Sequence, residues 1–227
     1  MALTKQQAEA QQRAQAARIA KKLKTLQTVK DAPRLLYALA DRDDFRAVVI
    51  GQAWIENTLV LLAERYLHLP DELNLARMSY DMKLSLAAAF QEVRPTERGA
   101  FKALGKLRNK LAHHLDEKLE AADADEIMGG LQEPKLRALV VTYKSFVQAR
   151  IHARDQDEAP PKLGPPTTVI KPLLLDAQVT VRAVILLLHA FLHASLDGPM
   201  NKSPGESYAD ALRRFGSGGL GPGLGAQ

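Results

Sequence analysis

Apolar residues recur three or four positions apart along most of the chain, which is the spacing of one face of an α-helix. The pattern predicts helices over residues 45–67, 80–93, 95–115, 123–131 and 134–157, and a long, mostly buried helix after residue 171. No stretch shows the strict alternation of a half-buried strand. The sequence therefore predicts an all-α fold, most simply an antiparallel helical bundle.

The same pattern divides the chain into five regions. Residues 1–30 form a basic arm that is expected to be helical, because it is rich in alanine and glutamine. Residues 31–157 form the bundle, and residues 158–170 form a proline-rich linker. Residues 171–196 are expected to form a helix that packs on the bundle, and residues 197–227 a flexible tail. The arm is interpreted either as a solvated extension or as an electrostatic arm for nucleic acid.

The amino-acid composition limits the expected location and partners of the protein. The chain has no cysteine, which excludes disulfides and thiolate zinc sites, and a reducing cytoplasm is the simplest location. The formal net charge is +5, which favours anionic partners such as RNA. The longest apolar run lies between Arg182 and His193 and is too short to span a bilayer, so no membrane partner is expected.

Polar residues cluster in the stretch LRNKLAHHLDE, Leu107–Glu117. On a helical wheel Arg108 falls inside an apolar stripe, whereas Asn109 and His113 lie on the opposite side. A buried guanidinium requires a partner. Arg108 therefore either pairs with Glu56 on a preceding helix, or faces a groove or subunit interface where its planar fork could hold a phosphate. The residues of the stripe are Phe101, Leu104, Leu111 and Leu115.

A row of basic residues approaches this stretch along the same helix. Lys102, Lys106 and Lys110 follow one another four residues apart, and His114 lies at the edge of the apolar face. The row is either the solvated face of an amphipathic helix or a track for a phosphodiester backbone. These four residues are the candidate substrate contacts.

His189 and His193 have the spacing of two metal ligands on one helical face. No third ligand and no catalytic glutamate accompany them, so they are interpreted as histidines at the edge of the core. No metal and no cofactor is predicted.

The stretch RNKLAH, Arg108–His113, fits the R-x4-6-H signature of HEPN domains. Three segments, AWIENTLVLLAERYL, MSYDMKLSLAAAFQEV and ALGKLRNKLAHHLDE, follow in an order that resembles the HEPN branch with the mannitol operon repressor. That branch has a glutamate-bearing helix, a helix with a lysine near its start, and then the arginine–histidine motif. The resemblance covers about residues 45–117.

The resemblance implies a homodimeric helical bundle. In active HEPN proteins, arginine and histidine from both subunits form a metal-independent ribonuclease centre. By that resemblance Arg108 would bind the scissile phosphate, His113 would transfer a proton, and Asn109 would orient either group. The implied function is a toxin- or defence-type endoribonuclease, with an antitoxin or regulatory protein as a further partner. The alternative is a non-enzymatic transcriptional regulator or interaction module, in which Arg108 pairs structurally with Glu56.

Overall fold

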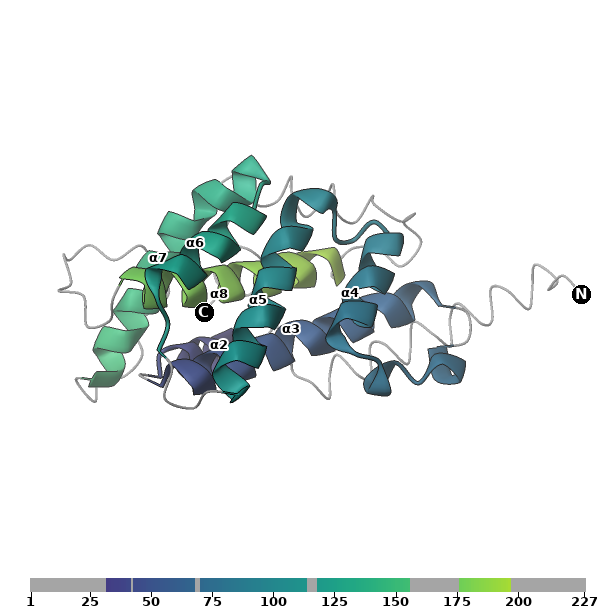
Figure 1. The fold of residues 1–227 in the computed structure, drawn as a ribbon, viewed down its shortest axis with the longest axis horizontal. Coiled ribbons are helices and arrows are strands. Elements are labelled where there is room, and N and C mark those ends of the chain that lie inside the picture. Colours follow the sequence, from purple (N-terminus) through teal and green to yellow (C-terminus); the bar gives the residue numbers. More distant parts are fainter. Residues whose placement is uncertain (1–31, 42, 68–69, 114–117, 156–175, 197–227) are drawn as a thin grey trace, which may run out of the picture.

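The computed structural model describes residues 32–41, 43–67, 70–113, 118–155 and 176–196, and within these ranges the chain contains helices and no strand (Figure 1). The expectation of an all-α helical bundle is confirmed. The predicted basic arm, the proline-rich linker and the tail lie outside the described residues, as does His114. The helices are α2 (Ala32–Leu39), α3 (Asp44–Tyr66), η1 (Pro70–Leu73), η2 (Leu75–Arg77), α4 (Tyr80–Ala89), α5 (Pro95–His113), α6 (Ala121–Gly130), α7 (Pro134–Asp155) and α8 (Asp176–Leu196).

Helices α3 and α8 lie side by side at the centre of the bundle and run in the same direction (Figure 1). Gly51 allows a close approach, because a Cβ atom added to it would lie 2.6 Å from Ile185 Cγ2. One turn further along, the rings of Trp54 and His189 meet edge to face, with 5.4 Å between their centroids. The missing side chain of Gly51 therefore sets the spacing of the central helix pair.

Helix α8 is enclosed on all sides. From Val179 to Leu196 every residue except Ala190 is buried, and α2, α3, α6 and α7 pack against the helix. By length and composition both α3 and α8 are apolar enough to cross a membrane, but 94% of the relevant window of α8 is buried inside the bundle. For α3 the buried share is 50%. An apolar surface all round is what a helix needs at the centre of a bundle.

Helices α5 and α6 run antiparallel and cross at two glycines. A Cβ atom added to Gly130 would lie 2.3 Å from the backbone nitrogen of Ala100, and one added to Gly99 would lie 2.8 Å from Gly130 Cα. The Thr96 carbonyl also accepts hydrogen bonds from the backbone N–H groups just after α6. The backbones thus touch directly, and α6 is held along the length of α5.

Helix α4 ends earlier than the sequence pattern predicts. Ser79 is its N-cap, as expected, and accepts a hydrogen bond from the Met82 N–H. The helix stops at Ala89 rather than at residue 93, because Gln91 adopts a left-handed conformation with φ of 58°. The N–H of Glu92 donates to the Ala87 carbonyl at 3.0 Å, which closes a Schellman motif. Glutamine is a rare choice at this position, so the sequence did not predict the end of the helix.

Candidate functional site

The arginine–histidine motif forms the last turns of α5. Leu107 and Leu111 are buried there, whereas Arg108, Asn109 and His113 are exposed. The prediction that Arg108 lies on the inward stripe is therefore wrong. The buried stripe is centred on Leu104, Leu107 and Leu111, and Arg108 lies at its margin.

The exposure of Arg108 follows from the position of α4 beside α5. The Tyr80 hydroxyl, at the start of α4, donates to the Phe101 carbonyl at 3.0 Å, and its ring packs against Gly105. Burial, and then the charge of Glu56, raise the pKa of Tyr80, so the hydroxyl stays protonated as a donor. Tyr80 is the first residue of α4, and it packs at the level of Gly105. Arg108 follows about one turn later on the same flank of α5 and is exposed.

The predicted partner of Arg108 is held by a different cation. Glu56 forms an ion pair with Lys83, whose side chain is only 4% exposed. The same ammonium group also reaches the Ala76 carbonyl at 3.4 Å. The expected Arg108–Glu56 pair is thus wrong, because Glu56 pairs with Lys83 of α4 and the Arg108 guanidinium donates to Asn109. Glu56 joins α3 to α4 and leaves Arg108 without a carboxylate from this helix.

The guanidinium of Arg108 turns toward the polar face of α5. Its Nη1 atom donates to Asn109 Oδ1 at 3.1 Å. Asn109 and His113 are four residues apart and therefore lie on one face of the helix, one turn from each other. The hydrogen bond brings the guanidinium round to the face that also carries His113. The three motif residues, which the helical wheel separated, thus share the exposed end of one helix.

The basic row of α5 divides into two groups. Lys106 forms an ion pair with Glu126 at 2.9 Å, and Lys110 binds both carboxylate oxygens of Asp123, at 3.1 and 3.2 Å. Lys102 is exposed, one turn closer to the N-terminus. The first pair is largely solvated and contributes little to stability, whereas the second is partly buried. Acidic residues of α6 therefore neutralise two of the three predicted substrate lysines.

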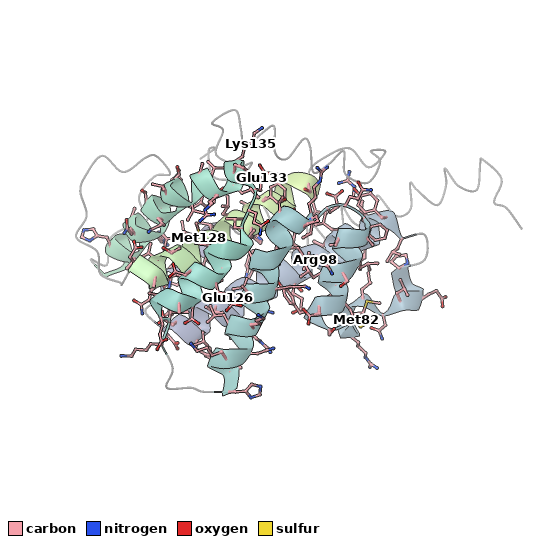
Figure 2. All side chains as sticks on the ribbon, turned by 45° about the horizontal axis from the view of Figure 1, so that its top comes forward. Met82, Arg98, Glu126, Met128, Glu133 and Lys135 are labelled. Carbon is pink, nitrogen blue, oxygen red and sulfur yellow. The ribbon has the colours of Figure 1, made fainter. Side chains whose placement is uncertain are left out.

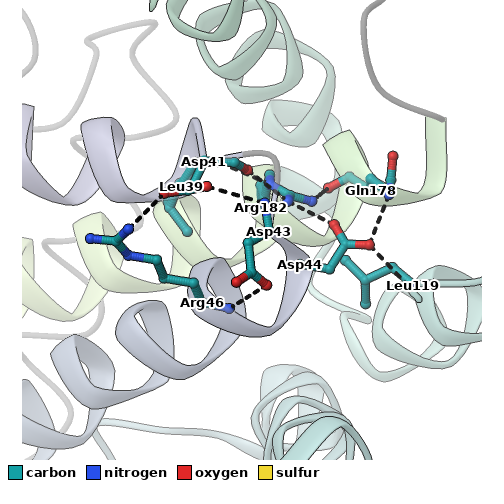
Figure 3. A network of polar contacts seen from close by, with 8 residues as sticks. All are labelled: Leu39, Asp41, Asp43, Asp44, Arg46, Leu119, Gln178 and Arg182. Carbon is teal, nitrogen blue, oxygen red and sulfur yellow. Dashed lines mark hydrogen bonds and ion pairs between the residues drawn. The ribbon is translucent and has the colours of Figure 1, made fainter. Parts of the chain in front are cut away.

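Figure 3 shows a buried network that the sequence interpretation missed. Arg182 of α8 is fully buried and pairs with Asp44 at 2.7 Å. Its guanidinium also donates to the carbonyls of Leu39, Asp41 and Gln178. The other oxygen of Asp44 accepts the Leu119 N–H at 3.2 Å and the Gln178 side-chain amide at 2.8 Å. An arginine inside an apolar helix was the available signal for this network.

One residue of this network, Leu119, follows the arginine–histidine motif closely in the sequence. Leu119 is the second described residue after the gap that follows His113, and α6 starts two residues later. Asp44 therefore fixes the entry to α6, the helix whose acids hold Lys106 and Lys110. The roles of Asp44 and Arg182 are accordingly structural, since both side chains are enclosed in the bundle.

His189 and His193 are buried rather than at the edge of the core. Their ring centroids are 4.4 Å apart, and His193 Nε2 lies 3.4 Å from the Thr58 hydroxyl. Burial lowers the pKa of His193 to about 4, and burial together with the neighbouring ring lowers that of His189 well below 6.5. Both rings are therefore neutral at pH 7. Among the described residues, no group of three or more metal-ligating side chains comes together.

Glu92 is a further buried carboxyl group, at the far end of α3. The Tyr66 hydroxyl donates to it, and burial raises its pKa. Nearby, Arg65 Nη1 donates to the Ser195 carbonyl at 2.7 Å and thus binds the end of α8. These contacts hold the ends of α3, α4 and α8 together, and they lie in the interior rather than on the surface of the bundle.

Comparison of the chain with protein-family models, with curated proteins and with solved structures gave no match. The resemblance to HEPN domains thus rests on the motif and on the order of its three segments.

Proposed function

We propose that this protein is a HEPN-like, metal-independent endoribonuclease of toxin or defence type, acting in the cytoplasm as a homodimer. One observation carries the proposal: the Arg108 guanidinium is exposed, is not held by Glu56, and is turned by Asn109 toward the face that carries His113. Arginine suits a phosphate site because its planar fork binds two oxygens and keeps its charge.

The chemistry requires few groups. The 2′-hydroxyl oxygen of RNA attacks the adjacent phosphorus, and the bond from phosphorus to the 5′-oxygen breaks. Arg108 would stabilise the negative charge on the non-bridging oxygens. One base must take the 2′-hydroxyl proton and one acid must protonate the leaving 5′-oxygen. Two copies of His113, one from each subunit, could supply both proton transfers, which is the chemical reason for a dimer.

The surface near the motif suggests which cations would guide the RNA. Lys102 is exposed on the same flank of α5 as Asn109, whereas Lys106 and Lys110 would first have to leave Glu126 and Asp123. We therefore expect Lys102 to contribute more to the salt dependence of RNA binding than Lys106.

The test is cleavage of total RNA in the presence of EDTA. Arg108→Ala and His113→Ala should each slow cleavage at least about 100-fold, and Asn109→Ala should slow it less. Arg137→Ala and His152→Ala, both on α7, are the matched controls and should cleave like wild type. The products should carry 2′,3′-cyclic phosphate and 5′-hydroxyl ends. Equal activity in all variants, or no cleavage by the wild type, contradicts the proposal.

A non-enzymatic regulator or interaction module is the second candidate, and the pairing of Lys106 and Lys110 with acids favours it. A surface whose charges are already paired attracts a polyanion weakly. The regulatory assignment is supported if the wild-type protein does not cleave RNA and binds it no more tightly than the Lys102→Ala variant does.

A further inference from the structure

A shallow apolar groove lies between α4 and the short helical turns η1 and η2, apart from the arginine–histidine motif. Two polar residues, Asp81 and Ser85, stand in its lining. Figure 2 shows Met82 at the surface of α4 and Arg98 on the neighbouring α5. The apolar lining consists of Leu73, Met78, Met82, Leu86 and Ala89.

Exposed large apolar side chains come together in this groove. Within the described ranges, large apolar side chains are exposed at four positions, and two of these, Met82 at 56% and Leu73 at 42%, line the groove. Of the others, the ring of Tyr37 is covered by the Arg150 guanidinium at 5.4 Å, and Val141 stands on α7. Neighbouring exposed apolar side chains of this kind typically mark an interaction surface.

The spacing of the lining residues favours a helical partner. Met82, Leu86 and Ala89 follow one another at the helical spacing of four and three residues, and so form a ridge about 10 Å long on α4. An amphipathic helix with anchors at the same spacing could lie in the groove beside this ridge. Unbranched methionine side chains adapt to such a partner, and Met78 and Met82 provide them on both walls.

Cations stand at the rim of the groove. Arg98 Nη2 donates to the Ser85 hydroxyl at 3.0 Å, which places a guanidinium at the edge formed by α5. Arg77 is exposed beside Met78 at the opposite wall. Asp81 is the one acid in the lining. At the edge formed by α5, where Arg98 stands, the rim therefore complements a partner that carries acidic residues beside its apolar anchors.

We propose that this groove binds an amphipathic helix of another protein, with apolar anchors three and four residues apart and acidic side chains flanking them. None of the seven lining residues is aromatic, so an RNA base would find no surface for stacking, and a protein partner is favoured over RNA. The proposal is independent of the ribonuclease assignment, because the groove residues do not include the motif.

The probe is a fluorescein-labelled helical peptide of 15 residues, with leucines at spacings of four and three and glutamates on either side of them. Its binding to the full-length protein is followed by fluorescence anisotropy. The wild-type protein should bind this peptide at least tenfold more tightly than it binds a second peptide in which lysine replaces every glutamate. Met82→Gln should weaken binding at least fivefold, whereas Val141→Gln, at an exposed apolar position on α7, should not.

Charge reversal tests the rim separately. Arg98→Glu should lose the preference for the acidic peptide, and Arg137→Glu, which changes the net charge equally, should keep it. Thermal unfolding of each variant checks that the fold is retained.

Three results would overturn the proposal. The first is a failure of the peptide test, shown either by equal binding of the acidic and basic peptides to wild type or by unchanged peptide binding in Met82→Gln. The second is a loss of RNA binding in Met82→Gln, which would assign the groove to nucleic acid. The third is a dimer that sediments as a monomer after Met82→Gln, which would make the groove a contact between two copies of this chain.

Discussion

Replacing Arg182 with methionine should destabilise the fold by about 3–5 kcal/mol, because it leaves Asp44 charged and buried without its cation. Asp44 is 7% exposed and would retain two donors, the Leu119 N–H and the Gln178 amide, which places the loss toward the lower end of that range. The carbonyls of Leu39 and Asp41 would also lose their donor. Methionine fills a similar volume, so the change tests the electrostatic contribution rather than a cavity.

The assay is urea unfolding at pH 7, followed by circular dichroism at 222 nm. Asp44→Asn alone should also destabilise the protein strongly, since it leaves the guanidinium without its counter-ion. The double variant should lose less than the sum of the two single losses, with a coupling of about 1–3 kcal/mol. Arg137→Met, on the exposed side of α7, is the control and should change stability by less than about 0.5 kcal/mol. A loss below about 1 kcal/mol for Arg182→Met, or strict additivity of the two single losses, would show that the Arg182–Asp44 pair does not stabilise the fold.

Three further predictions concern stability. Burial depresses the pKa values of His189 and His193, so the unfolded chain binds more protons than the folded protein below pH 6.5. The free energy of unfolding should therefore fall as the pH drops from 6.5 toward 4. Urea unfolding of a variant with leucine at both histidines should show a flatter dependence over this window, and an unchanged slope would count against the assignment. Gly130→Ala should lower stability by about 1–3 kcal/mol, because the new Cβ atom would meet the α5 backbone. A Cβ atom at Gly129 meets nothing within 4 Å, so Gly129→Ala should not lower stability, and thermal melts compare the two variants. Gln91→Gly should raise stability by about 0.5–1 kcal/mol in urea unfolding, because glycine adopts a φ of 58° without strain, and a loss would contradict the Schellman assignment.

The periodic pattern of apolar residues was sufficient to predict the helical class, because helices such as α5 have a buried face that repeats every three or four residues. It placed the starts of α4 and α5 correctly, since Ser79 and Pro95 are strong local signals. It failed at the end of α4, where a glutamine occupies a conformation that usually requires glycine.

The site was harder to predict than the helices, because burial depends on which neighbours cover a helix and for how many turns. The wheel placed Arg108 inward, but the residue is exposed, one turn after the position where Tyr80 of α4 packs against Gly105. The partner of Glu56 likewise depends on which residues meet in three dimensions, and it is Lys83 of α4. Spacing along one helix contains no information about such contacts between helices.

The pairing of lysines with α6 was also outside the reach of the sequence pattern. Lys106 and Lys110 read as members of one basic row, yet the antiparallel crossing at Gly99 and Gly130 brings Glu126 and Asp123 opposite them. A lysine with no evident partner in the sequence can thus be neutralised by an acidic residue of the helix that follows.

We propose that Arg108 acts on RNA rather than on the stability of the fold. The most direct measurement compares the rate constants of Arg108→Ala and Arg137→Ala for RNA cleavage in EDTA, with the thermal stability of both variants recorded alongside. If Arg108 binds the scissile phosphate, Arg108→Ala alone should cleave RNA at least about 100-fold more slowly, and both variants should be as stable as wild type. Equal cleavage rates for the two variants would contradict it.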